Sequence, residues 1–167
     1  MTEILKFYNN ELNISKHTHD LVLKSSDFYW EGCHDFIQFV FPTNKPSAYC
    51  KIAPLVTKED IASFKDNHMQ CLLWQSFDRF IKFLGIAKTK KSNPHYFEII
   101  NFDAFNAKVL TPGHNLLRIT RLFESIKLLG YKDLKHDCIE LHRFLVKEMN
   151  IRMCEYHRTV GFWNQAI

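Results

Sequence analysis

The sequence predicts an all-α fold: a single compact helical domain of about six or seven helices, spanning residues 1–167. Apolar residues recur at helical spacing along most of the chain, and strand signals are sparse. Five glycines and five prolines are too few for a many-turned all-β fold. A chain of 167 residues, 46% hydrophobic and 24% charged, is the size of one domain that can bury a proper core.

The composition also limits the classes of partner. A net charge of +4 with no dense Lys/Arg run argues against a nucleic-acid surface but is compatible with an anionic or a protein partner. The N-terminus lacks the pattern of a signal peptide, and no apolar run reaches the roughly 18 residues of a membrane span. The cysteines are scattered, odd in number and form no CxxC pair, which predicts reduced thiols and a cytoplasmic protein. They are Cys33, Cys50, Cys71, Cys138 and Cys154.

The first third of the chain contains two weak helix signals and one strong one. We expect a short helix within residues 1–15 and one or two helical turns in 17–24, with Leu21 and Val22 facing inward. Trp30–Phe41 predicts a mostly buried helix. Its single polar arc carries no Lys or Arg and consists of Glu31, His34, Asp35 and Gln38. Pro42 ends this helix, and residues 42–56 are expected to be an extended loop.

The middle of the chain begins with Thr57-Lys-Glu-Asp60, the [ST]xx[DE] form of a helix start. The helical pattern then runs to Leu84, and a register shift near residues 67–68 predicts a kink or two separate helices. Residues 87–95 are expected to be a polar and mobile loop. Residues 96–110 are predicted to be mostly helical, although 96–100 could be extended.

The strongest helix signal is His114–Gly130, where Gly130 fits a C-terminal cap. One broad apolar face contains Ile119, Leu122, Phe123, Ile126 and Leu129. A separate row, at spacing i, i+4, i+7 and i+11, contains His114, Arg118, Arg121 and Ser125. Leucines border this row on both sides, so its two arginines need acceptors, because a buried unpaired charge is very costly.

Two helices are expected after this one. Leu134, Cys138, Leu141, Leu145 and Met149 recur at the spacing of an amphipathic helix that packs on one side. A last helix begins near Asn150, and its Phe162 and Trp163 are expected to dock the C-terminus onto the core.

Two stretches resemble the opioid growth factor receptor conserved region. His34-Asp-Phe-Ile-Gln-Phe-Val-Phe-Pro42 is similar to that family's HDxIQWLFP segment, and His114–Gly130 is similar to its HNxLRITRxLxSLxxLG segment. Ala53-Pro54-Leu55 also fits, and the resemblance is strongest over residues 27–130. It implies a helical domain and, in animal members, recognition of an enkephalin peptide and nuclear or perinuclear residence.

The chain departs from the animal pattern, since Phe39 stands where Trp is usual and the repeat-bearing region and basic targeting runs do not occur in this sequence. We therefore assign the residues of the family motif to this chain, but not the binding of an enkephalin peptide. They are the candidate ligand-binding residues His34, Asp35, Gln38, His114, Asn115, Arg118 and Arg121.

These residues support three functional hypotheses. The first is a binding module in which the basic row forms a pocket for an anionic ligand, either a small phosphorylated or carboxylated molecule or an acidic peptide. The second is an enzyme that acts on a nucleotide-like or other anionic substrate with His34 and His114 as acid and base. The third is a purely structural protein-interaction domain, whose surface would include Phe162 and Trp163.

The row also has a structural interpretation, in which Asp35 and Glu31 pair with Arg118 and Arg121 and hold two core helices in register. If a pocket exists, we expect Arg118, near the helix start, to meet the ligand and Arg121 to be the structural residue.

A metal site is not predicted, and neither is a cofactor. Nine histidines are present, but none form HxxxH or HExxH, and structural zinc usually needs four ligands in close pairs. Cys33 and His34 are adjacent and would point to different faces of a helix. His17, His19 and His157 are expected at the surface.

Overall fold

The computed structural model describes residues 1–89, 96–152 and 157–167, and most of these residues are helical. They form ten α-helices, one π-helix and one two-stranded sheet. In chain order these are α1 Glu3–Tyr8, α2 His19–Lys24, α3 Asp27–Gly32, α4 Ile37–Val40, α5 Lys58–Ser63, α6 Asn67–Phe83, β1 Ile86–Lys88, β2 Phe97–Ile99, α7 Phe102–Phe105, the π-helix η1 Asn106–Leu110, α8 His114–Leu129, α9 Lys132–Arg152 and α10 His157–Ala166. The helical class is confirmed, whereas six or seven helices and a strictly all-α fold are both wrong.

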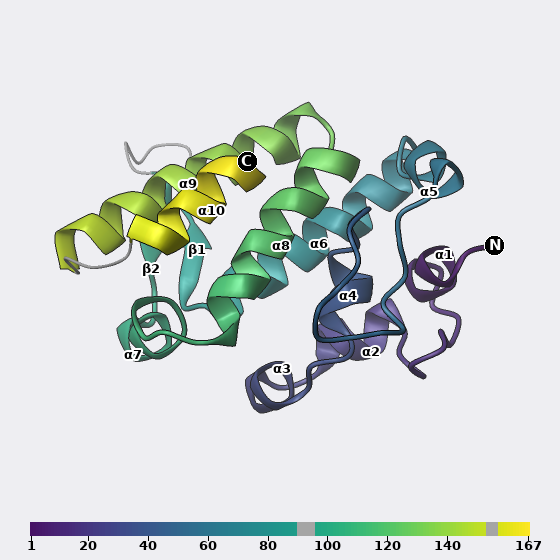
Figure 1. Ribbon diagram of the computed structural model, residues 1–167, viewed down its shortest axis with the longest axis horizontal. Coiled ribbons are helices and arrows are strands. Elements are labelled where there is room, and N and C mark those ends of the chain that lie inside the picture. The colour runs from purple at the N-terminus through teal and green to yellow at the C-terminus, as the bar shows by residue number, and fades with distance from the viewer. Residues whose placement is uncertain (90–95, 153–156) are drawn as a thin grey trace.

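Helix α8, which confirms the helix predicted for 114–130, lies in the middle of the molecule, and α9 and α10 lie along one side of it (Figure 1). It packs against α10, α9 and η1. Every residue of its predicted apolar face is buried. From α10, Trp163 is fully buried and donates from its indole Nε1 to the carbonyl of Leu116, whereas Phe162 is 49% exposed. Of the two aromatic residues expected to dock the C-terminus, only Trp163 is buried.

The predicted start at Thr57 and the predicted interruption near residue 67 are both confirmed. Thr57 and Asp60 form a capping box at α5, and the Asp60 carboxylate accepts hydrogen bonds from both the backbone N–H and the hydroxyl of Thr57. Helix α5 ends at Ser63, and α6 begins after the cap of Asp66. The register shift therefore marks two helices, because Asp66 starts a new one.

The short antiparallel hairpin β1–β2 was not predicted, although the extended alternative for 96–100 is correct. Ile86 pairs with Ile99, and Lys88 pairs with Phe97. Each strand has three residues, too few to show an alternating pattern in the sequence. Asp137 of α9 fixes the hairpin, because it accepts hydrogen bonds from Lys88 Nζ at 2.7 Å and from Tyr96 Oη at 2.6 Å. Most of the predicted mobile loop, residues 90–95, lies outside the described residues.

The largest error concerns Trp30–Phe41, which is not one helix. Helix α3 ends at Gly32, Cys33 is extended with φ −94° and ψ 133°, and α4 begins only at Ile37. The chain bends between them. The cause is a tertiary contact with α8, which is described with the candidate site below.

Two N-terminal side chains also differ from expectation. Leu21 is 61% exposed, while Val22 is buried as predicted. His19, expected at the surface, is fully buried, stacks on Tyr8 with ring centroids 5.0 Å apart and places Nε2 2.9 Å from Ser76 Oγ. The side chain of His157 lies outside the described residues.

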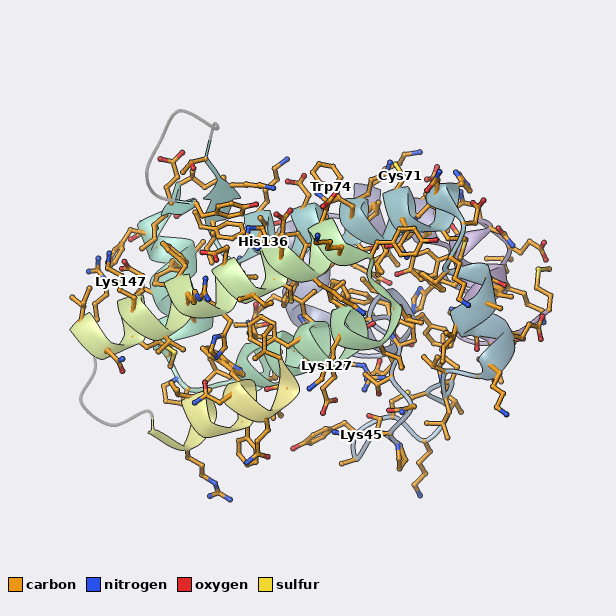
Figure 2. All side chains as sticks on the ribbon, turned by 90° about the horizontal axis from the view of Figure 1, so that it is seen from above. Lys45, Cys71, Trp74, Lys127, His136 and Lys147 are labelled. Atoms are coloured by element: carbon orange, nitrogen blue, oxygen red, sulfur yellow. The ribbon has the colours of Figure 1, made fainter. Side chains whose placement is uncertain are left out.

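The four cysteines that the structure describes are all free thiols, as predicted, while Cys154 lies outside the described residues. Cys71 lies on the outer face of α6, near Trp74 (Figure 2). No helix in the described ranges is long and apolar enough to cross a membrane.

The first test concerns Gly85, which joins α6 to β1 with φ +83°. A Cβ there would lie 2.3 Å from the carbonyl oxygen of Asn101 and 3.0 Å from the backbone nitrogen of Phe105. Gly85→Ala should lower the free energy of unfolding by at least about 1–3 kcal/mol, measured by denaturant titration. Gly161→Ala, where a Cβ meets no atom within 4 Å inside α10, is the control and should be neutral or stabilising by up to about 1 kcal/mol. Equal stability of both variants would contradict the described turn.

The second test concerns His19, whose pKa desolvation lowers to about 4. The unfolded chain takes up this proton more readily than the folded chain, so the contribution is complete above the ordinary pKa and is lost as pH falls through about 4. The free energy of unfolding should fall between about pH 6.5 and 4, with roughly 2–4 kcal/mol from this residue. His19→Gln should flatten this slope in denaturant titrations across pH, whereas His136→Gln, at an exposed position on α9, should retain it.

Candidate functional site

The predicted site residues come from the connection between α3 and α4, from α4 itself and from the N-terminal half of α8. These stretches are in contact, because side chains of α8 reach backbone carbonyls at the ends of both short helices. Carbonyls at the end of a helix have no partner within it. Cations are favoured at that end, where the helix dipole is negative.

Arg118 bonds the end of α3. Its side chain is buried, and Nη1 donates to the carbonyl of Trp30 while Nη2 donates to that of Cys33 at 2.7 Å. In a continuous helix these carbonyls would accept from the N–H groups four residues later. Arg118 supplies the donors instead, so the chain can leave the helix at Cys33. Nη1 also donates to Asn115 Oδ1 at 3.3 Å, and Nη2 lies 3.2 Å from His34 Nδ1.

Arg121, one turn further along α8, makes the corresponding contact with α4. Its Nε donates to the carbonyl of Phe41, the C-cap of α4, at 2.8 Å. Its Nη2 is buried without a hydrogen-bond partner among the described residues. Arg121 was expected to be the structural arginine, but Arg118 forms more hydrogen bonds within the protein.

The predicted carboxylate partners are wrong for both arginines. Within the described ranges, neither guanidinium forms an ion pair with Asp35 or Glu31. Burial lowers the pKa of Arg118 and of Arg121 to about 10, so both remain protonated at neutral pH. The two backbone acceptors of Arg118 carry no charge, and among the described residues its charge is offset from further away, chiefly by Glu31.

Glu31 instead joins the start of α8. Its carboxylate accepts from Asn115 Nδ2 at 3.1 Å and lies 3.2 Å from His114 Nε2, without the alignment of a hydrogen bond. The rings of His34 and His114 meet edge to face with centroids 4.8 Å apart. Desolvation and the charge of Arg118 lower the pKa of His114. His34 is exposed and His114 is half-buried, so this cluster reaches the surface above the buried Arg118.

Asp35 and Gln38 do not join this cluster. Asp35 Oδ1 accepts from Cys33 Sγ at 2.9 Å and lies 3.0 Å from His17 Nε2. Burial opposes ionisation of Asp35, but the hydrogen bonds from Cys33 and His17 outweigh it and hold the pKa of this carboxyl below its usual value. Gln38 is buried on α4, where its Oε1 has no partner within the described part of the chain.

The contacts of His17 and Tyr29 with this connection could not be predicted from the sequence. Tyr29 Oη lies 3.2 Å from His17 Nδ1, on the ring edge opposite Asp35. His17 precedes α2 in a loop, and no periodic pattern connects it with Cys33 or Asp35. Only the folded chain brings these side chains together.

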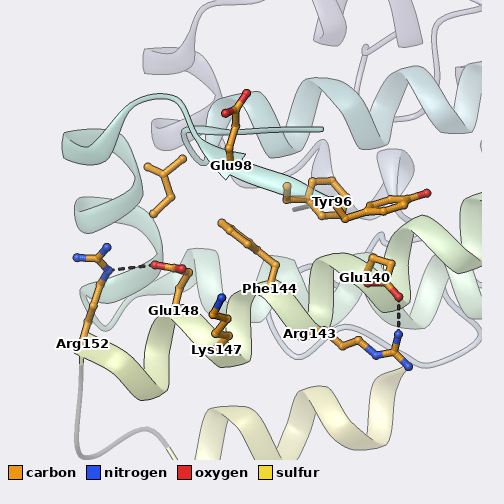
Figure 3. Close-up of a pocket in the computed structure, with 10 residues that line it drawn as sticks. Tyr96, Glu98, Glu140, Arg143, Phe144, Lys147, Glu148 and Arg152 are labelled. Atoms are coloured by element: carbon orange, nitrogen blue, oxygen red, sulfur yellow. Dashed lines mark hydrogen bonds and ion pairs between the residues drawn. The ribbon is translucent and has the colours of Figure 1, made fainter. Parts of the chain in front are cut away.

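A separate groove lies between β2 and α9, with a volume of about 540 Å³ (Figure 3). Tyr96, Phe97 and Phe144 supply aromatic surface, while Glu140 pairs with Arg143 and Glu148 pairs with Arg152. None of the predicted site residues lines it. Its acidic and basic side chains largely compensate one another, so charge does not select a ligand there.

With this geometry in view, comparison with known proteins gives the family. Residues 1–158 match the opioid growth factor receptor (OGFr) conserved region, a longer match than the 27–130 seen in the motifs. The chain belongs to the OGFr conserved-region family. It is 28% identical over 149 residues to the opioid growth factor receptor of Mus musculus, covering 86% of this chain and 23% of the relative. It is 27% identical over 156 residues to that of Homo sapiens, covering 90% of this chain and 23% of the relative.

The opioid growth factor receptor of Rattus norvegicus is 28% identical over 149 residues, which cover 86% of this chain and 25% of the relative. The chain thus spans about a quarter of the length of these curated relatives. No solved structure matches it.

The third test compares the two arginines. Arg118→Leu leaves the carbonyls of Trp30 and Cys33 without a donor and should lower the free energy of unfolding by about 2–6 kcal/mol, at about 1–3 kcal/mol for each unpaired carbonyl. Arg121→Leu leaves one carbonyl, that of Phe41, without its donor and should cost about half as much, about 1–3 kcal/mol. Denaturant titration of both variants measures the difference. An equal or larger loss for Arg121→Leu would contradict the unequal bonding described above.

Proposed function

We propose that this chain is a binding module that holds an anionic group at the N-terminal end of α8. The ligand is a small phosphorylated or carboxylated molecule, or an acidic peptide. His114 and His34 contact it at the surface, and Asn115 and Arg118 support them from below. The single observation that carries this proposal is the position of two adjacent histidines above a buried arginine, to which no carboxylate of the described residues is bonded directly.

The start of α8 strengthens the electrostatic argument. Its N-cap is Gly113, which has no side chain to accept hydrogen bonds from the first-turn N–H groups. Such N–H groups and the positive end of the helix dipole favour an anion. Glu31 already occupies part of this region beside His114 and Asn115, so a ligand anion would compete with an internal carboxylate.

The relatives support a binding role in general terms. Each is named a receptor for opioid growth factor, and this chain corresponds to about a quarter of such a receptor. Our proposal for this chain includes the binding role but does not include the opioid ligand of those proteins. Arg121 remains in the proposal because it holds the C-terminal end of α4, whereas Asp35 and Gln38 lie apart from the two histidines and are given no contact with the anion.

The fourth test measures anion binding by titration calorimetry with phosphate, citrate and a phosphoserine peptide, at several pH values. Because the pKa of His114 lies below its ordinary value in the free protein, His114 gains its proton only in more acidic solution, or when an anion stabilises it. Affinity should therefore rise as pH falls. His114→Ala should remove this dependence and weaken binding by about 1.5–3 kcal/mol, the value of one charge-assisted hydrogen bond.

His68→Ala is the matched control, because His68 lies exposed on α6 and its loss should leave binding unchanged. The proposal fails if none of the anions binds, or if His114→Ala and His68→Ala bind them equally well.

The 4.8 Å separation of the His34 and His114 rings also favours a second candidate, an enzyme acting on an anionic substrate. Incubation with nucleotides followed by mass analysis separates the two functions, since an enzyme forms a product and a binding module returns the ligand unchanged. Retention of no small molecule at all would favour the purely structural interaction domain, whose surface includes Phe162 but not the buried Trp163.

A further inference from the structure

A second cluster of polar side chains lies beside the α3–α4 connection and has no part in the proposed anion site. One imidazole nitrogen of His17, Cys33 Sγ and one carboxylate oxygen of Asp35 all lie within 4.8 Å of one another, and the nitrogen that faces Asp35 is Nε2. His17 and Cys33 are half-buried, and the Asp35 side chain is 53% exposed. We infer that these three side chains form a binding site for a divalent zinc-like ion, with water as the fourth ligand.

The choice of ion follows from the ligand atoms. A thiolate together with an imidazole nitrogen selects zinc over magnesium or calcium, which prefer sets of oxygen atoms. Three protein ligands with one position open to water are also a common zinc arrangement.

The distances agree with a site that adjusts slightly to accept an ion, since the three ligand atoms already lie within 4.8 Å of one another. Bonds of about 2.0–2.3 Å in a tetrahedral site place the ligand atoms about 3.2–3.7 Å apart. At present Asp35 Oδ1 lies 2.9 Å from Cys33 Sγ and 3.0 Å from His17 Nε2, which are hydrogen-bond distances. Because Asp35 lies exposed in a bend, its carboxylate can move the remaining few tenths of an ångström.

The backbone of Cys33 and of His17, and the ring of His17, are held in position before any ion binds. The Cys33 carbonyl accepts from Arg118, and its N–H donates to the carbonyl of Tyr29 at 2.9 Å. The His17 N–H donates to Asn13 Oδ1 at 2.9 Å, and Asn13 is buried. The His17 ring also packs edge to face on Tyr29 and on Phe36.

Tyr29 supplies the outer contact that metal-binding histidines usually have. To donate to Asp35 without an ion, His17 carries its proton on Nε2. Ion binding needs the Nε2 lone pair, so the proton moves to Nδ1 and is donated to Tyr29 Oη, which lies 3.2 Å away. Cys33 binds as the thiolate and releases its proton to solvent, so one proton leaves for each ion bound.

The test uses the whole chain, freed of metal with a chelator, and Zn²⁺ as the probe. In the wild-type protein, one equivalent of Zn²⁺ should slow alkylation of Cys33 at least tenfold, measured by mass mapping of the labelled peptides. Cys71, exposed on α6, is the internal control and should react at the same rate with and without the ion (Figure 2). An unchanged alkylation rate at Cys33 would overturn the assignment.

Variants then test the ligand set by competition with a chromophoric chelator. Cys33→Ser and His17→Gln should each weaken Zn²⁺ binding at least tenfold, whereas Cys71→Ser and His68→Gln should bind like the wild type. Substitution by Co²⁺ should give a thiolate-to-metal absorption band that Cys33→Ser lacks. Zinc held by other histidines of the chain would leave His17→Gln at wild-type affinity, and that result would also overturn the proposal. Neither arm involves anion binding at His114, so the two proposals can fail separately.

Discussion

Arg118 and Arg121 of α8 hold the ends of two short helices, and the centre of this protein depends on that contact. Each arginine donates to carbonyls that the ends of α3 and α4 leave unpaired, at Trp30, Cys33 and Phe41. A buried guanidinium is costly unless its donors are used, and free carbonyls inside a protein are costly as well. The guanidinium groups supply donors to these carbonyls, and these hydrogen bonds hold α8 against the N-terminal part of the chain.

The same contact determines which way the α3–α4 connection faces. Because the Cys33 carbonyl accepts from Arg118 rather than from a helical N–H group, the residues after Cys33 do not continue the helix. His34 can then meet His114, while Cys33 and Asp35 meet His17. One short connection therefore contributes to two clusters of different chemistry, a histidine pair above a buried cation and a mixed sulfur, nitrogen and oxygen set.

These contacts give a physical meaning to the stretches that carry the family resemblance. The first contains His34 and Phe41, and the second contains His114, Arg118 and Arg121. They are far apart in the sequence and adjacent in the fold, where side chains of the second bond the backbone of the first or pack on it. The two stretches that carry the family resemblance therefore meet at the centre of the fold.

The sequence by itself determined the features that rest on local chemistry. These features are the helical class, the extent of α8, the capping box at Thr57 and the helix break near Asp66. Periodicity and caps act within a few residues, so these features could be predicted from pattern alone.

Only the tertiary structure decided which partners the polar residues take. A helical pattern continued through Trp30–Phe41, and nothing local showed that Arg118, 88 positions after Trp30, would take over the carbonyl bonding. Opposite charges predicted that carboxylates would pair with the arginines. In the folded chain the arginines bond backbone carbonyls, and Asp35 lies beside His17. Contacts between residues far apart in the sequence depend on how the packed helices meet. Such hydrogen-bond partners have no characteristic spacing in the sequence by which they could be recognised.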